Sequence, residues 1–356
     1  MYTQNAYYEP FSLGLFLYLP EGHSTHAVYM KDMKDSSAPS LSICVCVNQK
    51  PALCYGMGSG QQQPTSPRQP FSIPLLELFV CLSLECQVSV EGFCNTLRWK
   101  NNLTLAEVIA LYRALVGESI SQFRHYHFRQ RSLVDVCPHL DDGTTCPAFP
   151  KADGDMIVTL DANFGLVRKQ SSGTSVVEPF HGTRMFVDEN DVEECLLSHP
   201  DSSKPNEDCS NFKAGNVLRS QQQAKKLDVT GGFGASCRHE MPLMFVNMSQ
   251  GEKLAYPLYV IDELLRRRED KNIHLRVVYD IACVVASHLR IKYSTRRLEG
   301  FGLTDGEGME RLWSFLRRFA RVTKEMTPSH RLDLLTDALL HYGRRKSTDL
   351  GLSTAV

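Results

Sequence analysis

The 356-residue sequence has almost no net charge, because 39 lysines and arginines face 40 aspartates and glutamates. A formal charge of −1 does not by itself indicate a nucleic-acid-binding protein. No apolar run approaches the roughly 20 residues that cross a bilayer, so we expect no membrane span and no membrane partner. The apolar stretch at residues 11–20 is short and follows acidic Glu9 instead of a basic segment, so we expect no secretory signal.

Paired CxxC motifs are also missing, although the chain has 12 cysteines. Without a secretory signal the thiols are expected to be reduced, and they then indicate metal binding or simple burial instead of disulfides. Cys209, Cys237 and His239 offer soft and borderline ligands, with Cys195 or His199 as further candidates. A tetrahedral zinc site and a set of buried free cysteines both remain open.

The positive charges are unevenly placed along this nearly neutral chain. The C-terminal part is locally basic, with clusters at residues 266–268, 296–297, 311–321 and 344–346. Such a bias fits contacts to nucleic-acid phosphates, and it equally fits ordinary solvated helix faces.

Composition divides the chain into segments. Residues 58–70 are rich in Gly, Gln, Pro and Ser, which is typical of a linker. Thr104 followed by Glu107 predicts a capping box at the start of a helix, and residues 71–85 predict a short core helix. These helices fit a structural pair or a DNA-reading module. The expected segments are an N-terminal region (1–57), the linker, a mostly helical cysteine-containing region (71–150), a main domain (151–340) and a tail (341–356).

From Met156 the pattern changes to short apolar runs that alternate with helical spacing. The segment 181–230 is long and polar, and we expect it to form an insertion outside the core. The predicted strands are residues 156–160, a second strand within 165–177, 241–248 and 274–279; the predicted helices are 254–268 and 281–289. This order favours an α/β fold.

Three acidic residues have unusual surroundings. Asp161 and Asp280 each follow an apolar, β-branched run, and Glu310 borders the apolar stripe of a helix. Carboxylates brought together repel by roughly 4 kcal/mol per pair at about 4 Å and an effective dielectric constant of 20. Such a cluster needs a cation, and Mg²⁺ or Mn²⁺ suits oxygen ligands. Glu307 is an alternative to Glu310, since an acidic residue is also favoured in a first helical turn.

Several long strings resemble the Kyakuja-Dileera-Zisupton (KDZ) family of DNA transposases. They include LDANFGLVRK, LDVTGGFGASCRHEMPLMFVNM, VVYDIACVVASHL and LTDGEGMERLWSFLRRF, in the order of the family. Upstream, Cys44, Cys46 and Cys54 resemble its CxC element. Cys137 and Cys146 fall where the family has a cysteine cluster, but CPAF places Phe149 where a cysteine ligand is expected.

The resemblance implies an RNase H-like catalytic core with a cysteine-containing insertion. It also implies a DDE-type transposase that cleaves double-stranded DNA at transposon ends and joins the strands, in the nucleus and as an oligomer of identical chains. Two Mg²⁺ or Mn²⁺ ions would be bound by Asp161, Asp280 and Glu310. Phosphate contacts are expected from Arg168, Lys169, Arg311 and Arg317.

The chain departs from the family pattern in length. Only 30 residues separate position 280 from position 310, where relatives carry a longer stretch, and the sequence ends soon after residue 346. We therefore expect a truncated or internally deleted copy. The alternatives are a catalytically inactive DNA- or protein-binding module, a nuclease without strand transfer, and a fragment that does not fold stably.

Overall fold

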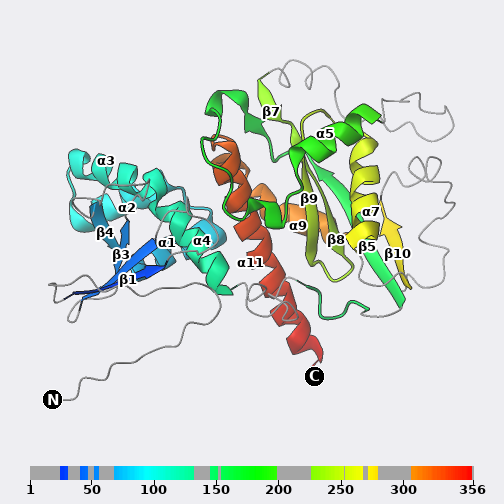
Figure 1. Cartoon of the computed structure of the whole chain (residues 1–356), viewed down its shortest axis with the longest axis horizontal. Helices are drawn as coiled ribbons and strands as arrows, with labels where there is room; N and C mark the ends of the chain where they lie inside the picture. The colour runs from blue at the N-terminus through cyan, green and yellow to red at the C-terminus, as the bar shows by residue number, and fades with distance from the viewer. Residues whose placement is uncertain are drawn as a thin grey trace. The chain divides into compact units, whose positions relative to one another are not determined.

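The computed structural model divides the chain into two compact units, Met1–Asp142 and Gly143–Val356 (Figure 1). No helix in the described part of the chain is long and apolar enough to cross a membrane. The described residues are 25–30, 41–46, 52–55, 68–131, 145–150, 154–198, 226–251, 253–267, 272–279 and 306–354.

The first unit combines a four-stranded antiparallel sheet with a helical cluster. The strands follow one another in chain order: β1 (Thr25–Met30), β2 (Leu41–Cys46), β3 (Ala52–Tyr55) and β4 (Arg68–Ser72). The helices are α1 (Ile73–Cys86), α2 (Val90–Asn101), α3 (Leu105–Ala114) and α4 (Ile120–Arg131), with a π-helical turn, η1 (Leu115–Ser119), before α4. Cys44 and Cys46 lie on β2, and Cys54 lies on β3.

Two predictions for this unit are confirmed. A helix, α1, occupies the segment predicted at residues 71–85. The capping box opens α3, since the Thr104 backbone N–H donates to Glu107 Oε2 at 2.8 Å and the Glu107 N–H donates to Thr104 Oγ1 at 3.3 Å. These bonds satisfy donors that the first turn of a helix otherwise leaves without partners.

The second unit is an α/β structure, as predicted, built on a mixed four-stranded sheet. Its order is β10-β5-β8-β9, with β10 parallel to β5 and the other pairs antiparallel. The strands are β5 (Gly154–Asn163), β8 (Gly231–Cys237), β9 (Pro242–Met248) and β10 (Ile273–Val278). A small two-stranded sheet joins β6 (Arg168–Lys169) to β7 (Leu227–Val229).

Helices cover both faces of this sheet (Figure 1). On one face, Val158 and Leu160 of β5 belong to a core that includes α5 (Glu189–Ser198) and α7 (Ala255–Arg267). On the other face, α9 (Gly308–Arg317) packs against β5 and β8. The chain then continues through α10 (Ala320–Thr323) into the long α11 (Pro328–Thr354), which contacts α9 and β9. Because α11 runs without a break across residue 340, the expected tail at 341–356 begins inside a helix.

Two sequence predictions hold only in part. The second strand within residues 165–177 shrinks to the two residues of β6 and a 3-10 turn at Gln170–Ser172. The sheet instead uses β8, the glycine-rich string GGFGASC, which has little of the β-branched character that marks strands. The expected insertion at 181–230 is also not all outside the core, because Val192 and Leu196 of α5 are buried in it. The predicted helix at 281–289 lies outside the described residues.

Candidate metal centre and acidic site

Asp161 lies on β5 and pairs in register with Gly234 of β8. Because side chains alternate along a strand, it lies on the face opposite to Val158 and Leu160. Helix α9 covers that face. A Cβ atom added to Gly232 of β8 would lie 3.8 Å from the Trp313 side chain of α9, and one added to Gly308 of α9 would lie 3.8 Å from Ser236 Oγ of β8. Asp161 is therefore half-buried beside α9, and its Oδ1 accepts a 2.7 Å hydrogen bond from the N–H of Ala162.

Helix α9 carries Glu310 in its first turn. Its apolar side is buried against the sheet through Met309, Leu312, Trp313 and Leu316, whereas Glu310 is exposed. Glu307, the alternative, is also exposed and pairs with Arg311 at 3.6 Å. The structure thus places Asp161 on the strand against which the helix of Glu310 packs. Asp280 lies outside the described residues, so its place beside the other two carboxylates stays a prediction.

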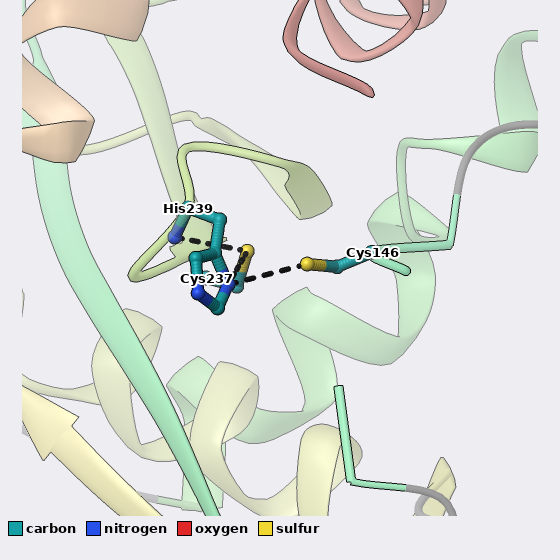
Figure 2. Close-up of side chains that lie close together, drawn as sticks. All are labelled: Cys146, Cys237 and His239. Carbon is teal, nitrogen blue, oxygen red and sulfur yellow. Dashed lines mark hydrogen bonds between the residues drawn. The ribbon is translucent and has the colours of Figure 1, made fainter. Parts of the chain in front are cut away.

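A second group of ligands converges at one end of the sheet. Figure 2 shows Cys146, Cys237 and His239 directed toward one another. His239 Nδ1 lies 3.3 Å from Cys146 Sγ and 3.9 Å from Cys237 Sγ, and all three ligand atoms lie within 4.8 Å of one another. Ligands of a tetrahedral zinc ion with bonds of about 2.0–2.3 Å lie roughly 3.5–3.8 Å apart. The donor types and the spacing therefore fit a metal such as zinc.

Two tight turns present these ligands. In CPAF, the Phe149 N–H donates to the Cys146 carbonyl at 3.1 Å. In the CRHE turn, residues 237–240, the Glu240 N–H donates to the Cys237 carbonyl at 2.8 Å, and the His239 N–H donates to Cys237 Sγ at 3.3 Å. Backbone N–H groups that point at a sulfur stabilise its thiolate form, which is the form that binds metal. The turns thus orient two thiols and one imidazole toward a common point.

Burial controls the protonation of this cluster. Burial, together with the neighbouring Cys146 thiol, raises the pKa of the Cys237 thiol. Burial and the nearby Arg238 charge lower the pKa of His239, which favours the neutral imidazole that binds metal. Without a cation the Cys237 thiol is therefore mainly protonated, and a bound cation would displace its proton.

Phe149 closes one side of the cluster. It packs against the buried side chains of Cys146, Cys237 and Met241, where the family pattern places a further cysteine. Among the described residues this cluster therefore offers three candidate ligands, and Phe149 stands at the sequence position where a cysteine was expected.

The other cysteines named from the sequence lie elsewhere. Cys195 is on α5, where its thiol donates to the Ala255 carbonyl at 3.9 Å beside the main core. Cys137, His199 and Cys209 lie outside the described residues. Sequence reasoning grouped Cys237 with His239 but set Cys146 aside because CPAF lacks the second cysteine. The signal that could have recovered it is the tight CPxx turn itself.

Glu240 connects the CRHE turn to the helices. It has a left-handed backbone, with φ at +65°, and its carboxylate accepts from Tyr342 at 2.7 Å and pairs with Arg311 and Lys346, each at 2.6 Å. Burial alone raises the pKa of this carboxyl, but the bonds from Lys346, Tyr342 and Arg311 outweigh it and hold the pKa below its usual range. The metal-ligand turn is thereby tied to α9 and α11.

The four predicted phosphate contacts differ in their surroundings. Arg168 is 2% exposed, and its guanidinium donates to the Met326 carbonyl at 2.7 Å and pairs with Asp228, so it joins elements inside the fold and cannot reach a ligand outside it. Lys169 is partly exposed and pairs with Glu325. Arg311 and Arg317 lie on the exposed side of α9. A Cβ on Gly165, just after β5, would lie 3.6 Å from Arg317 Cγ, so Arg317 borders the strand of Asp161.

Comparison with known proteins gives the family. The sequence matches the Kyakuja-Dileera-Zisupton transposase family over residues 154–292 and 288–342, which together cover more than half of the chain. No curated protein and no solved structure matches it. The match begins at the first residue of β5 and reaches into α11, so it contains Asp161, the CRHE turn and Glu310. The chain therefore belongs to the Kyakuja-Dileera-Zisupton transposase family.

Proposed function

We propose that this chain is a DDE-type DNA transposase. It cleaves phosphodiester bonds at transposon ends and transfers the resulting strands, using Mg²⁺ or Mn²⁺ bound by acidic residues. Family membership supports a transposase-type function that acts on DNA. The carboxylate assignment, the metal ions and the nuclear location expected for a DNA substrate belong to the proposal.

The sheet order supports an RNase H-like core. Three consecutive antiparallel strands, β5, β8 and β9, are followed by helix α7 and by β10, which returns parallel to β5 on its other side. A parallel return of this kind needs a crossover, and α7 supplies it. Strand β5, which carries Asp161, is then one of the two central strands of the sheet.

The observation that carries the proposal is the position of Asp161 on the α9 face of this central strand. Val278 of β10 pairs with Thr159 of β5, and Asp280 and Asp161 each follow that pair by two residues in the sequence. Glu310 comes from the helix that covers the same face. Strand register and helix packing thus support the grouping of these three carboxylates.

In this proposal the chain's own residues position the metal ions and the scissile phosphate. Asp161, Asp280 and Glu310 would hold the cations, whose chemistry is activation of water or of a DNA 3′-hydroxyl and stabilisation of the leaving oxygen. Oxygen donors suit Mg²⁺ and Mn²⁺. Arg317, beside Gly165, and Arg311 offer positive charge next to Glu310 for the scissile phosphate. We assign Arg168 to folding instead of DNA contact, because it is buried.

The Cys146, Cys237 and His239 cluster fits a structural role for zinc in this proposal. It would fix the turn between β8 and β9, which holds α9 through Glu240 and Arg311. A cation there would act on the helix of Glu310 without touching DNA.

The test compares two aspartates of the same strand. Purified wild type, Asp161→Asn and Asp155→Asn are incubated with supercoiled plasmid and transposon-end DNA in Mn²⁺, and nicking and strand joining are measured. We expect Asp161→Asn to lose roughly 1000-fold in rate, the equivalent of several kcal/mol of charge stabilisation. Asp155→Asn, at the far end of β5, should keep the wild-type rate. Equal activity of wild type and Asp161→Asn would refute the assignment.

One observation favours a second candidate, a catalytically inactive DNA-binding module. Only 30 residues separate position 280 from position 310. The same assay separates the two: DNA binding by a folded wild type that never nicks DNA supports the inactive module, and cleavage without joining supports a nuclease.

A further inference from the structure

An open groove lies between α9 and α11, next to the predicted catalytic helix face. Its walls carry four cations, Arg311 of α9, Arg318 at the C-cap of α9, and Arg345 and Lys346 of α11, with Asp349 as the acidic residue among its lining residues. All of these residues belong to the second unit. A concentration of positive charge in a nearly neutral chain indicates an anionic partner.

Two of the cations cover aromatic rings at the groove floor. The Arg318 guanidinium lies 4.8 Å from the centre of the Phe315 ring, and the Lys346 ammonium lies 5.4 Å from that of Tyr342. Both rings are nearly buried, at 6% and 7% exposure. Nucleic acid that stacks its bases on a protein needs exposed ring faces. This groove therefore presents charge and no stacking platform, which suits a phosphate backbone better than unpaired bases.

Glu240 holds part of the groove in place. Its carboxylate pairs with both Arg311 and Lys346 at 2.6 Å and accepts from Tyr342 at 2.7 Å, so one partly buried anion links the two walls. Arg318 and Arg345 are exposed. Side chains that are fixed before binding lose less conformational entropy when a ligand arrives.

The groove adjoins the face of α9 that carries Glu310. On a helical wheel of α9, with 100° per residue, Arg317, Glu310, Ser314 and Arg311 occupy one continuous exposed sector, and Arg318 at the C-cap of the helix continues it. A duplex whose scissile phosphate reached Glu310 would pass its backbone over Arg318 and Arg345 within the next turn or two of α9.

We propose that the groove formed by Arg311, Arg318, Arg345 and Lys346 binds the phosphate backbone of double-stranded DNA independently of sequence and holds the duplex next to the cleavage site. This inference rests on the proposed function, because it takes DNA as the substrate. The contacts position the DNA and carry no sequence information.

The experiment measures DNA binding without catalysis. Full-length protein is titrated against two fluorescein-labelled duplexes of unrelated sequence and one single strand, with no added Mg²⁺ or Mn²⁺, between about 50 and 200 mM salt. The test variant is Arg318→Gln with Arg345→Gln. The matched control is Lys100→Gln with Arg113→Gln, which removes the same charge from exposed positions on α2 and α3. Circular dichroism checks that each variant is folded.

Each phosphate contact contributes about 0.9 to the slope of log affinity against log salt concentration. We expect the groove variant to lower that slope by roughly 2 and to weaken both duplexes equally, by on the order of 10- to 100-fold at the lowest salt concentration. The control variant should keep the wild-type slope.

Four outcomes would overturn the groove assignment: an unchanged slope in the groove variant, an equal loss in the control, a loss confined to the single strand, or no duplex binding by the wild type. The outcomes are separable from those of the cleavage test. An unchanged slope in a protein that cleaves DNA refutes the groove alone, and a lowered slope in a protein that never cleaves supports the groove while the catalytic proposal fails.

Discussion

At the scale of single residues, Asp155 and Arg276 form an ion pair between the two strands that precede the predicted aspartates. Arg276 Nε on β10 lies 2.7 Å from Asp155 Oδ1 on β5, and each side chain is about 30% exposed. The Arg276 guanidinium holds the pKa of the Asp155 carboxyl below its usual range. The pair joins the parallel strands in the register that aligns Val278 with Thr159.

Asp155→Asn should therefore destabilise the fold in a pH-dependent way. A carboxyl whose pKa is lower in the folded state stabilises that state above its unfolded-state pKa, and this contribution is lost as pH falls through the folded-state pKa. For a partly exposed pair we expect a loss of up to about 1 kcal/mol in the free energy of unfolding at pH 7, smaller at high salt. Urea denaturation at pH 7 and near pH 3 measures it. A deficit of the same size at both pH values would contradict the ion-pair explanation.

At the scale of elements, β8 depends on a glycine that sequence patterns treat as unfavourable in a strand. A Cβ at Gly234 would lie 2.4 Å from Phe245 Cδ1. Phe245 is 1% exposed and meets the Trp313 ring of α9 edge-on, with ring centres 5.6 Å apart. The absence of a side chain at Gly234 thus lets Phe245 lie under α9, directly beside the strand position of Asp161.

Gly234→Ala should cost about 1–3 kcal/mol of unfolding free energy, because the added methyl group forces a buried aromatic ring to move. Gly251→Ala is the matched control, since nothing lies within 4 Å of a Cβ at that position. We expect the control to stay within about 0.5 kcal/mol of wild type. Urea denaturation followed by circular dichroism compares the two. Equal stabilities would mean that Phe245 can relax without cost.

The same glycines explain what sequence could and could not predict. Regular apolar patterns located β5, β9, β10, α7 and α9, because each element buries one side in a way that its spacing records. Strand β8 was not predicted because Gly231, Gly232 and Gly234 carry no apolar side chain, although close neighbours leave no room for a Cβ at Gly231 and Gly234. α5 was taken for part of an insertion because only Val192 and Leu196 of its ten residues are buried.

The candidate site shows the same division. Cys237 and His239 were recognised as a pair because they are two positions apart, whereas Cys146 stands 91 positions before Cys237, and only folding brings it within reach. Spacing along the chain cannot report such a contact. The burial of Arg168 was likewise invisible, because its partners include the carbonyl of Met326, 158 positions away.

At the scale of the whole molecule, a net charge of −1 hides two opposite local arrangements. The groove between α9 and α11 gathers cations, whereas Asp161 lies on the face of β5 that is covered by α9, the helix of Glu310. Glu240 stands between them and is also part of the CRHE turn that carries two metal ligands. Metal binding, the predicted catalytic helix and the groove are thus mechanically connected through one turn.

Zinc should therefore raise the free energy of unfolding, and Phe149 should limit the affinity for zinc. A ligand that binds only the folded state at 100 times its Kd adds about 2.7 kcal/mol to the free energy of unfolding. Phe149 packs against the apolar cluster of Cys146, Cys237 and Met241, at the sequence position where a further cysteine was expected. We expect Phe149→Cys to tighten zinc binding by about 10- to 100-fold, which adds roughly 1.4–2.7 kcal/mol at a fixed zinc concentration.

Phe149→Ser, which removes the ring without adding a thiolate, is the control. Thermal unfolding with zinc and with a chelator measures the difference for each protein, so any change in zinc-free stability cancels. If the cysteine and serine variants respond to zinc alike, position 149 does not face the metal.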